Sequence, residues 1–160
     1  MQKKFTDPIA LLMQEHDETL HQLQKLSKAS KGLFEKGYSA EHVRQVMASL
    51  KFISEEVHHH NHTEEQALFP ILERYIEGPT RIMRNDHKEL YKNYAKLRKA
   101  VTKVIAQKGD SEAVKALAAI GKNVVQIFVN HIHKENYILF PLVQEFLSRH
   151  ELREVARKMV

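Results

Sequence analysis

Residues 58 to 70 have the sequence HHHNHTEEQALFP, and a variant of this stretch returns near the end of the chain. The segment HTEEQALFP at 62–70 matches HKENYILFP at 133–141, an offset of 71 residues. The same offset pairs further residues of identical or similar type: His16 with His87, His60 with His131, Glu64 with Glu135, and Glu15 with Asp86. Each half of the chain thus carries one histidine and, 44 residues later, the motif His-x-x-x-Glu.

Cap and turn residues divide the sequence into long helical segments. The first opens at Asp7-Pro8, an N-cap followed by a proline at the first helical position, and ends between Gly32 and Gly37. The second starts near Ser39 and continues to Gly78-Pro79.

The second half repeats this division. A third segment runs from Pro79 to the turn at 108–110, and a fourth from Ser111, as N-cap, to about Ser148. Pro70 and Pro141 fall inside the second and fourth segments, where each is expected to kink its helix or to end the regular part of it.

Helical spacing of apolar residues throughout predicts an all-α fold. We expect one domain spanning residues 1–160, built as an up-down-up-down antiparallel four-helix bundle with an internal two-fold repeat. The repeat halves span about 7–77 and 79–148, and a short C-terminal helix covers about 149–160. The apolar stripe of that tail favours packing on its own bundle, with docking of a partner as the alternative.

Composition narrows the functional classes. The net charge of +5 arises from 25 Lys and Arg against 20 Asp and Glu, spread along the chain, which favours a solvated surface over nucleic-acid binding. No apolar run approaches the roughly 20 residues of a membrane span, so we expect a cytoplasmic protein without a membrane partner. The absence of cysteine excludes thiolate metal sites and cysteine nucleophiles.

The repeated His-x-x-x-Glu motif points to a metal. Positions i and i+4 lie on one helix face, so His60 with Glu64, and His131 with Glu135, can reach a common centre. Buried ion pairs are the alternative interpretation. Burying four imidazoles and two carboxylates without a cation is costly, which favours metal binding.

The repeat also sorts the crowded histidines of 58–62. His60 alone combines a repeated partner with a repeated carboxylate four residues later. His58, His59 and His62 lie roughly 100 to 200 degrees around the helix from His60 and are expected to be exposed or to support the ligands indirectly.

The pattern of a single histidine followed by His-x-x-x-Glu, present twice, resembles the hemerythrin-like family of HHE cation-binding domains. The runs EEQALFP and HIHKENYILFP are similar to the family's most recognisable segments, and the resemblance covers about residues 7–146. Ferritin-like bundles differ, because they use Glu-x-x-His and more carboxylates than histidines.

The resemblance implies a non-haem di-iron centre with an oxo or hydroxo bridge. It places one iron on His16 and His60 and the other on His87 and His131, with Glu64 and Glu135 bridging them. The donor chemistry fits iron or manganese, or a mixed pair, better than structural zinc.

One position departs from the oxygen-carrying hemerythrins, which have a further histidine where this chain has Tyr91. With six-coordinate irons, the donors present would leave one open position on each iron, which argues against a dedicated oxygen carrier. Tyr91 has three interpretations: a core aromatic, a hydrogen-bond donor to a bound oxygen species or water, or a direct phenolate ligand.

Three functional classes follow. The first is a redox-active di-iron protein acting on dioxygen, nitric oxide or peroxide, in oxidative or nitrosative stress or in iron handling. The second is a module that binds, stores or senses oxygen or nitric oxide without turnover, and the third is a metal-stabilised structural bundle. The expected partners are a small gaseous or peroxide ligand and an electron donor.

Overall fold

The computed structural model describes residues 5–159, which form helices and turns and contain no strand. The all-α prediction is therefore confirmed. In chain order the helical elements are α1 (Pro8–Lys36), α2 (Ala40–Phe52), η1 (Ile53–Val57), α3 (His58–Thr63), η2 (Glu64–Leu68), α4 (Phe69–Leu72), α5 (Gly78–Ala106), α6 (Ser111–Lys134), η3 (Glu135–Leu139), α7 (Phe140–Phe146) and α8 (Arg149–Lys158).

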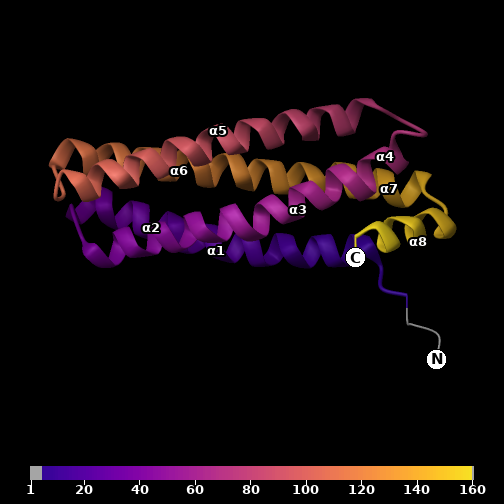
Figure 1. Cartoon of the computed structure of the whole chain (residues 1–160), viewed down its shortest axis with the longest axis horizontal. Coiled ribbons are helices and arrows are strands. Elements are labelled where there is room, and N and C mark those ends of the chain that lie inside the picture. The colour runs from indigo at the N-terminus through magenta and orange to yellow at the C-terminus, as the bar shows by residue number, and fades with distance from the viewer. Residues whose placement is uncertain (1–4, 160) are drawn as a thin grey trace.

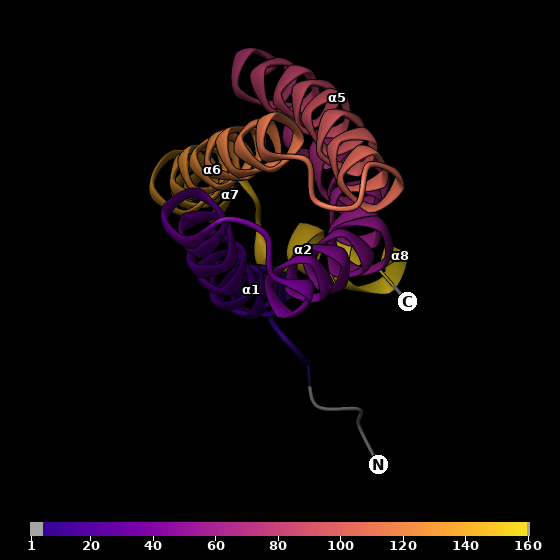
Figure 2. The same ribbon diagram turned by 90° about the vertical axis from the view of Figure 1, so that its left-hand side faces the viewer.

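The elements join into five continuous helical segments, because α2 to α4 and α6 to α7 follow one another without a gap. The long segments lie side by side, and α8 lies across the end formed by α4, α7 and the start of α1 (Figure 1). Helix α1 packs against α2 and α6, and α5 packs against α6 and α2. Viewed along the long axis, α1, α2, α5 and α6 surround a common interior (Figure 2).

Helix starts follow the caps in the sequence, with one exception. The side chain of Asp7 accepts a hydrogen bond from the backbone N–H of Ile9, and Ser39 caps α2. The prediction of Ser111 as N-cap is wrong: Asp110 caps α6 by accepting from the N–H of Ala113. A carboxylate in an extended residue directly before the helix reaches that N–H, so Ser111 becomes the first helical residue.

The second segment also ends earlier than predicted. Helix α4 stops at Leu72, and Tyr75 donates its N–H to the carbonyl of Leu72 in a short turn before Gly78 begins α5. Helix α1 continues through Gly32 and ends at Gly37, whose φ of 79° suits a residue without a side chain.

Regular α-helix is interrupted just before each internal proline, and the helical segment continues through the proline. Pro70 and Pro141 are the second residues of α4 and α7, and each follows a π-helical turn, η2 or η3. Proline lacks an N–H and its ring collides with the carbonyl four residues earlier in a regular helix. The wider π turn is compatible with proline because its hydrogen bonds span five residues.

The apolar interior forms two clusters. The first contains side chains from α1, α2, η1, α5 and α6, including Val57, Leu90 and Phe128. The second gathers side chains from η2, α4, η3, α7, α8 and the starts of α1 and α5, including Phe69 and Phe140.

The tail helix packs on its own chain, as predicted. Val155 of α8 is fully buried, and Leu152 and Met159 pack against the second cluster. Glu151 accepts hydrogen bonds from the Tyr75 hydroxyl and from the backbone N–H of Ser148, and Arg74 pairs with Glu154 at 2.9 Å. Among residues 5–159, no helix has the length and apolarity needed to span a membrane.

Candidate metal centre

Six side chains predicted from the repeat come together between the two apolar clusters. They are His16 on α1, His60 on α3, Glu64 on η2, His87 on α5, His131 on α6 and Glu135 on η3. All six are buried, and Glu64 and Glu135 have no exposed surface at 0% each. Four long helices thus each contribute donors to one enclosed point.

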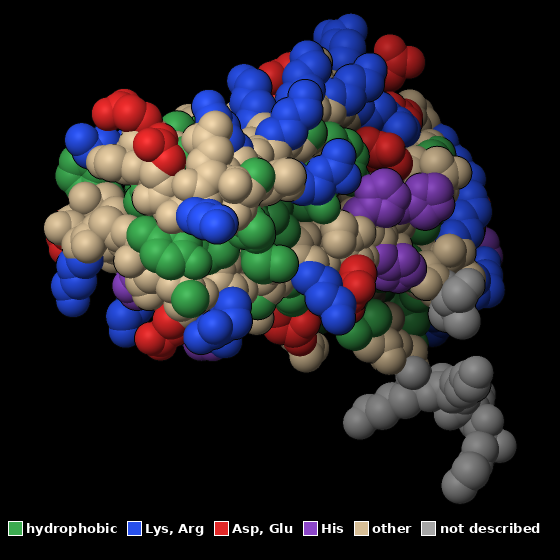
Figure 3. All heavy atoms as spheres, turned by 60° about the vertical axis from the view of Figure 1, so that its left-hand side comes forward, with side chains coloured by type: hydrophobic (Ala, Val, Ile, Leu, Met, Phe, Trp, Pro, Cys, Tyr) green, Lys and Arg blue, Asp and Glu red, His purple; other side chains and the backbone are tan. Residues whose placement is uncertain are grey.

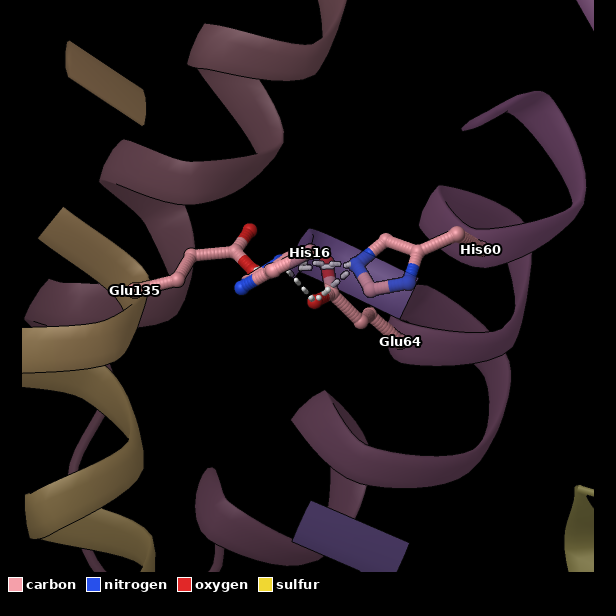
Figure 4. Close-up of side chains that lie close together, drawn as sticks. All are labelled: His16, His60, Glu64 and Glu135. Atoms are coloured by element: carbon pink, nitrogen blue, oxygen red, sulfur yellow. Dashed lines mark hydrogen bonds and ion pairs between the residues drawn. The ribbon is translucent and has the colours of Figure 1, made fainter. Parts of the chain in front are cut away.

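The first half of the centre consists of His16, His60, Glu64 and Glu135, which point toward one another, with His60 and Glu64 on the same helical segment (Figure 4). The Nε2 atom of His60 lies 2.9 Å from Oε1 of Glu64, and that of His16 lies 3.0 Å from Oε2 of Glu135. The two Nε2 atoms are 3.0 Å apart. One donor atom from each of the four residues therefore fits around a single ion.

The second half consists of His87, His131 and the same two glutamates. Nε2 of His131 lies 2.6 Å from Oε1 of Glu135, and Nε2 of His87 lies 3.3 Å from Oε2 of Glu64. Within each half, the donor atoms all lie within 4.8 Å of one another. Both carboxylates are shared by the two halves, so the site has the form of a two-ion centre with carboxylates between the ions.

The opposite nitrogen of every imidazole is also held by an oxygen. His16 donates from Nδ1 to Oδ1 of Asn136 at 2.6 Å, and His87 to Glu65 at 2.8 Å. The remaining pairs are His60 with Glu15 at 2.5 Å and His131 with Asp86 at 3.2 Å, and Asp86 also contacts Lys134.

These contacts fix the tautomer in which Nε2 is free to face the centre, and they raise its basicity as a ligand. They also obey the 71-residue offset. Glu15 and Asp86 are equivalent positions, and so are Glu65 and Asn136.

Two phenylalanines of the Leu-Phe-Pro motifs orient the histidines from the other side. The ring of His16 stacks on Phe140 with 5.4 Å between centroids, and that of His87 stacks on Phe69 at 5.9 Å. The same phenylalanines close the π turns, since the N–H of Phe69 donates to the carbonyl of Glu64 and that of Phe140 to the carbonyl of Glu135. π turns inside α-helices are frequent at functional sites.

Electrostatics couple the six groups. Burial opposes the charged form of His87, yet the nearby carboxylates of Glu135 and Glu64 raise its pKa to about 10. Burial likewise disfavours a charged Glu135, but its contacts with Glu64, His131 and His16 hold its pKa well below the ordinary value. Without a cation, the protonated imidazole of His87 therefore balances part of the carboxylate charge, and a metal must displace that proton because ligating histidine is neutral.

The donor set fits a cation on a further observation. Both oxygens of Glu64, both oxygens of Glu135, and Nε2 of His87 and His131 are buried without a hydrogen-bond partner among the described residues. Buried polar atoms are normally paired, and leaving one unpaired costs about 1–3 kcal/mol. Atoms that converge on one point but do not bond to each other are arranged as metal ligands are.

The structure places the other candidates outside this centre. Tyr91 is half-buried, and its hydroxyl lies 3.5 Å from Nδ2 of Asn61. His58, His59 and His62 are exposed, and histidines reach the surface close to Lys and Arg on the face drawn in Figure 3.

Sequence reasoning missed Glu65 and Asn136, which directly follow the two shared glutamates, and it missed Asn61. The offset that pairs Glu65 with Asn136 could have drawn attention to both.

The comparison with known families agrees with this geometry. Residues 7–143 match the model of the hemerythrin HHE cation-binding domain. The chain belongs to this family. The predicted resemblance is confirmed, and the all-helical arrangement is compatible with the hemerythrin fold. Membership in a family of HHE cation-binding domains and the two buried His/Glu groups both indicate metal binding.

Curated relatives of this HHE domain are iron-sulfur cluster repair proteins. YtfE of Yersinia pseudotuberculosis serotype IB (strain PB1/+) is 29% identical over 102 residues, which cover 61% of this chain and 46% of the relative. YtfE of Yersinia pestis (strain Pestoides F) gives the same values. The chain therefore spans about half the length of the curated relatives that it matches.

Proposed function

We propose that this protein is a non-haem di-iron protein that binds and redox-processes a small molecule, namely dioxygen, nitric oxide or peroxide. The observation that carries the proposal is that each shared glutamate directs its two carboxylate oxygens toward histidines of different halves of the centre. Glu64 directs Oε1 to His60 and Oε2 to His87, while Glu135 directs Oε2 to His16 and Oε1 to His131. Carboxylates divided in this way suit two neighbouring cations.

Iron is the metal that the donors and the relatives favour together. Imidazole and carboxylate suit iron or manganese, and the matched relatives are named for the repair of iron-sulfur clusters. Two bound irons, bridged by the carboxylates and by oxo or hydroxo, would supply the electron-transfer chemistry, with electrons from an external donor.

The residues of the chain supply the surroundings of such a centre. Glu15, Glu65, Asp86 and Asn136 hold the four imidazoles in one tautomer. The phenylalanine rings of the second cluster exclude water from one side of the ligands. Such a shell keeps the ligand geometry constant when the charge at the centre changes.

The fold that we infer for this function is an up-down-up-down four-helix bundle with α8 as an added tail. Its long members are α1, the segment from α2 to α4, α5, and the segment from α6 to α7 (Figures 1 and 2). A centre built from one donor group per helix is typical of cofactor sites in helix bundles.

A role in iron handling or in oxidative or nitrosative stress is the biological setting that we propose. Support comes from the relatives named iron-sulfur cluster repair proteins. Because the chain covers 46% of those relatives, the proposal extends only to the metal-binding part of such a function.

Metal analysis of the purified protein tests the proposal. We expect about two irons per chain, an oxidised protein with the optical spectrum of a bridged diferric unit, and loss of at least one iron in His60→Ala and in His131→Ala. The matched controls are His62→Ala and His133→Ala, which remove exposed histidines at equivalent repeat positions and should retain the iron. Full iron content in both ligand variants would refute the assignment.

Turnover distinguishes an enzyme from a binding module. The reduced iron protein should consume nitric oxide or peroxide repeatedly when an electron donor is supplied. A stable, reversible adduct without net consumption would instead assign binding, storage or sensing.

A further inference from the structure

A small cavity adjoins the candidate metal centre on the side of the first apolar cluster. Three of the four ligand histidines, His16, His60 and His131, form part of its wall. Its volume of about 10 Å³ is close to the minimum that holds one water molecule. Only a ligand of two or three heavy atoms could fit after modest side-chain movement, which excludes larger organic substrates.

The rest of the cavity wall consists of residues at equivalent positions of the two halves. Thr19 pairs with Leu90, Val57 with Phe128, and Asn61 with Ile132, each pair 71 residues apart. The first half thus supplies a hydroxyl and an amide, where the second half supplies only apolar groups. The internal symmetry that governs the six candidate ligands is broken in this wall.

Asn61 is the polar group of the wall with hydrogen-bonding capacity to spare. The Thr19 hydroxyl already donates to the carbonyl of Glu15 at 2.9 Å. The Asn61 amide has two N–H groups, and within residues 5–159 its side chain makes a single hydrogen bond, a donation to the Tyr91 hydroxyl at 3.5 Å. Asn61 is only 2% exposed, so water does not satisfy this donor from the surface.

We propose that the cavity receives the small ligand of the centre and that Asn61 positions it by donating a hydrogen bond to a ligand atom with a lone pair. The inference rests on the proposed function. It implies a preference for ligands that accept hydrogen bonds, since a buried donor left unpaired disfavours ligands that cannot.

Azide binding to the oxidised iron protein tests this role, with dissociation constants taken from the absorption change. Asn61→Leu removes both N–H donors at similar volume and should weaken azide binding about tenfold or more, because a hydrogen bond to a charged group contributes about 1.5–3 kcal/mol. Asn130→Leu makes the same exchange at an exposed position of α6 outside the cavity and should leave azide affinity within about twofold. Iron content and melting temperature are measured for each variant.

Each result of the azide experiment supports or overturns a defined part of the proposal. Equal azide affinity in the wild type and in Asn61→Leu, at equal iron content, overturns the role of Asn61 alone. If Asn61→Leu fails to hold iron, Asn61→Ala, which also lacks a side-chain donor, replaces it, and unchanged azide affinity in that variant overturns the role as well. An iron-loaded wild type that binds no azide overturns the cavity as a ligand site, whereas a wild type without iron refutes the proposed function itself.

Discussion

Glu64 and Glu135 each face both groups of histidine nitrogens, one carboxylate oxygen toward each group. Neither glutamate belongs to one half of the centre, although each lies on a helix with one histidine four residues earlier. The two halves of the repeat therefore meet through these carboxylates, and the loss of either should be felt at both metal positions.

Substitution of a shared glutamate should remove more metal than substitution of a histidine. Glu64→Gln or Glu135→Gln should lower the iron content from about two per chain to well under one, because a carboxylate that divides its oxygens serves both ions. His60→Ala should retain part of its iron. Elemental analysis makes the comparison, with the exposed Glu55→Gln as control. Glutamate variants that keep more iron than His60→Ala would contradict the shared role.

The side-chain oxygens that accept hydrogen bonds from the histidine Nδ1 atoms should strengthen metal binding although they are not ligands themselves. Glu65→Ala removes the acceptor 2.8 Å from Nδ1 of His87 and should weaken metal binding about 10- to 100-fold. Glu65→Gln should lose less, because an amide oxygen already serves His16 at the equivalent position, Asn136. Competition with a chelator of known affinity provides the measurement. Equal losses in the two Glu65 variants would show that charge, and not the acceptor, is what His87 needs.

Tyr91→Phe should leave the iron content intact. The hydroxyl contacts Asn61 and lies outside both groups of donor atoms, so its removal alters the cavity only through the amide. We expect a change in reactivity toward peroxide or nitric oxide smaller than that of Asn61→Leu, measured by stopped-flow absorption. Loss of iron in Tyr91→Phe would identify the tyrosine as a ligand.

Acid should loosen α8 through Glu151. A hydrogen bond from Tyr75, then the backbone N–H of Ser148 and the charge of Arg74, lower the pKa of Glu151 below its ordinary 4.5. A lowered folded-state pKa means that the stabilisation is complete above the unfolded-state pKa and is lost as pH falls through the folded-state value. The protection of the Val155 amide from hydrogen exchange, expressed relative to the intrinsic exchange rate at each pH, should therefore fall below about pH 4.5.

The comparison that isolates this effect is Glu151→Gln. In this variant, the protection of the Val155 amide should depend less on pH in that range. Glu154 pairs with both Arg74 and Lys158, and all three residues remain in the variant, so they affect the wild type and the variant equally. The exposed Glu145→Gln serves as control. An unchanged pH profile in Glu151→Gln would assign the acid response to other groups.

The fold class and the six central residues could be predicted because both depend on local pattern and on a repeat that is visible in one dimension. Cap residues predicted most helix starts for the same reason, although an adjacent Asp110 outcompeted Ser111. The π turns could not be predicted. A proline within a helical pattern is compatible with a break, a kink or a wider turn, and packing of the following residues decides among them.

The repeat marks the residues that hydrogen-bond to the histidines, but the sequence does not say which histidine each of them contacts. His16 meets Asn136 across 120 residues, and His87 meets Glu65 from the opposite half of the chain. Such contacts depend on how the helices are rotated against one another. The cavity wall depends on the same rotation, so Asn61 appeared in the sequence only as one polar residue among histidines.

The π turns also determine which side of the helix the residues after them occupy. Each inserts one residue relative to a regular helix, and one residue corresponds to about 100° of rotation around the helix axis. Deleting a single residue between Glu64 and Phe69 would restore uniform winding but swing Phe69, Ile71 and Leu72, all fully buried, away from the interior. The extra residue thus allows one continuous helix to direct the Glu64 carboxylate toward the candidate metal centre and, one turn later, to direct apolar side chains into the second cluster.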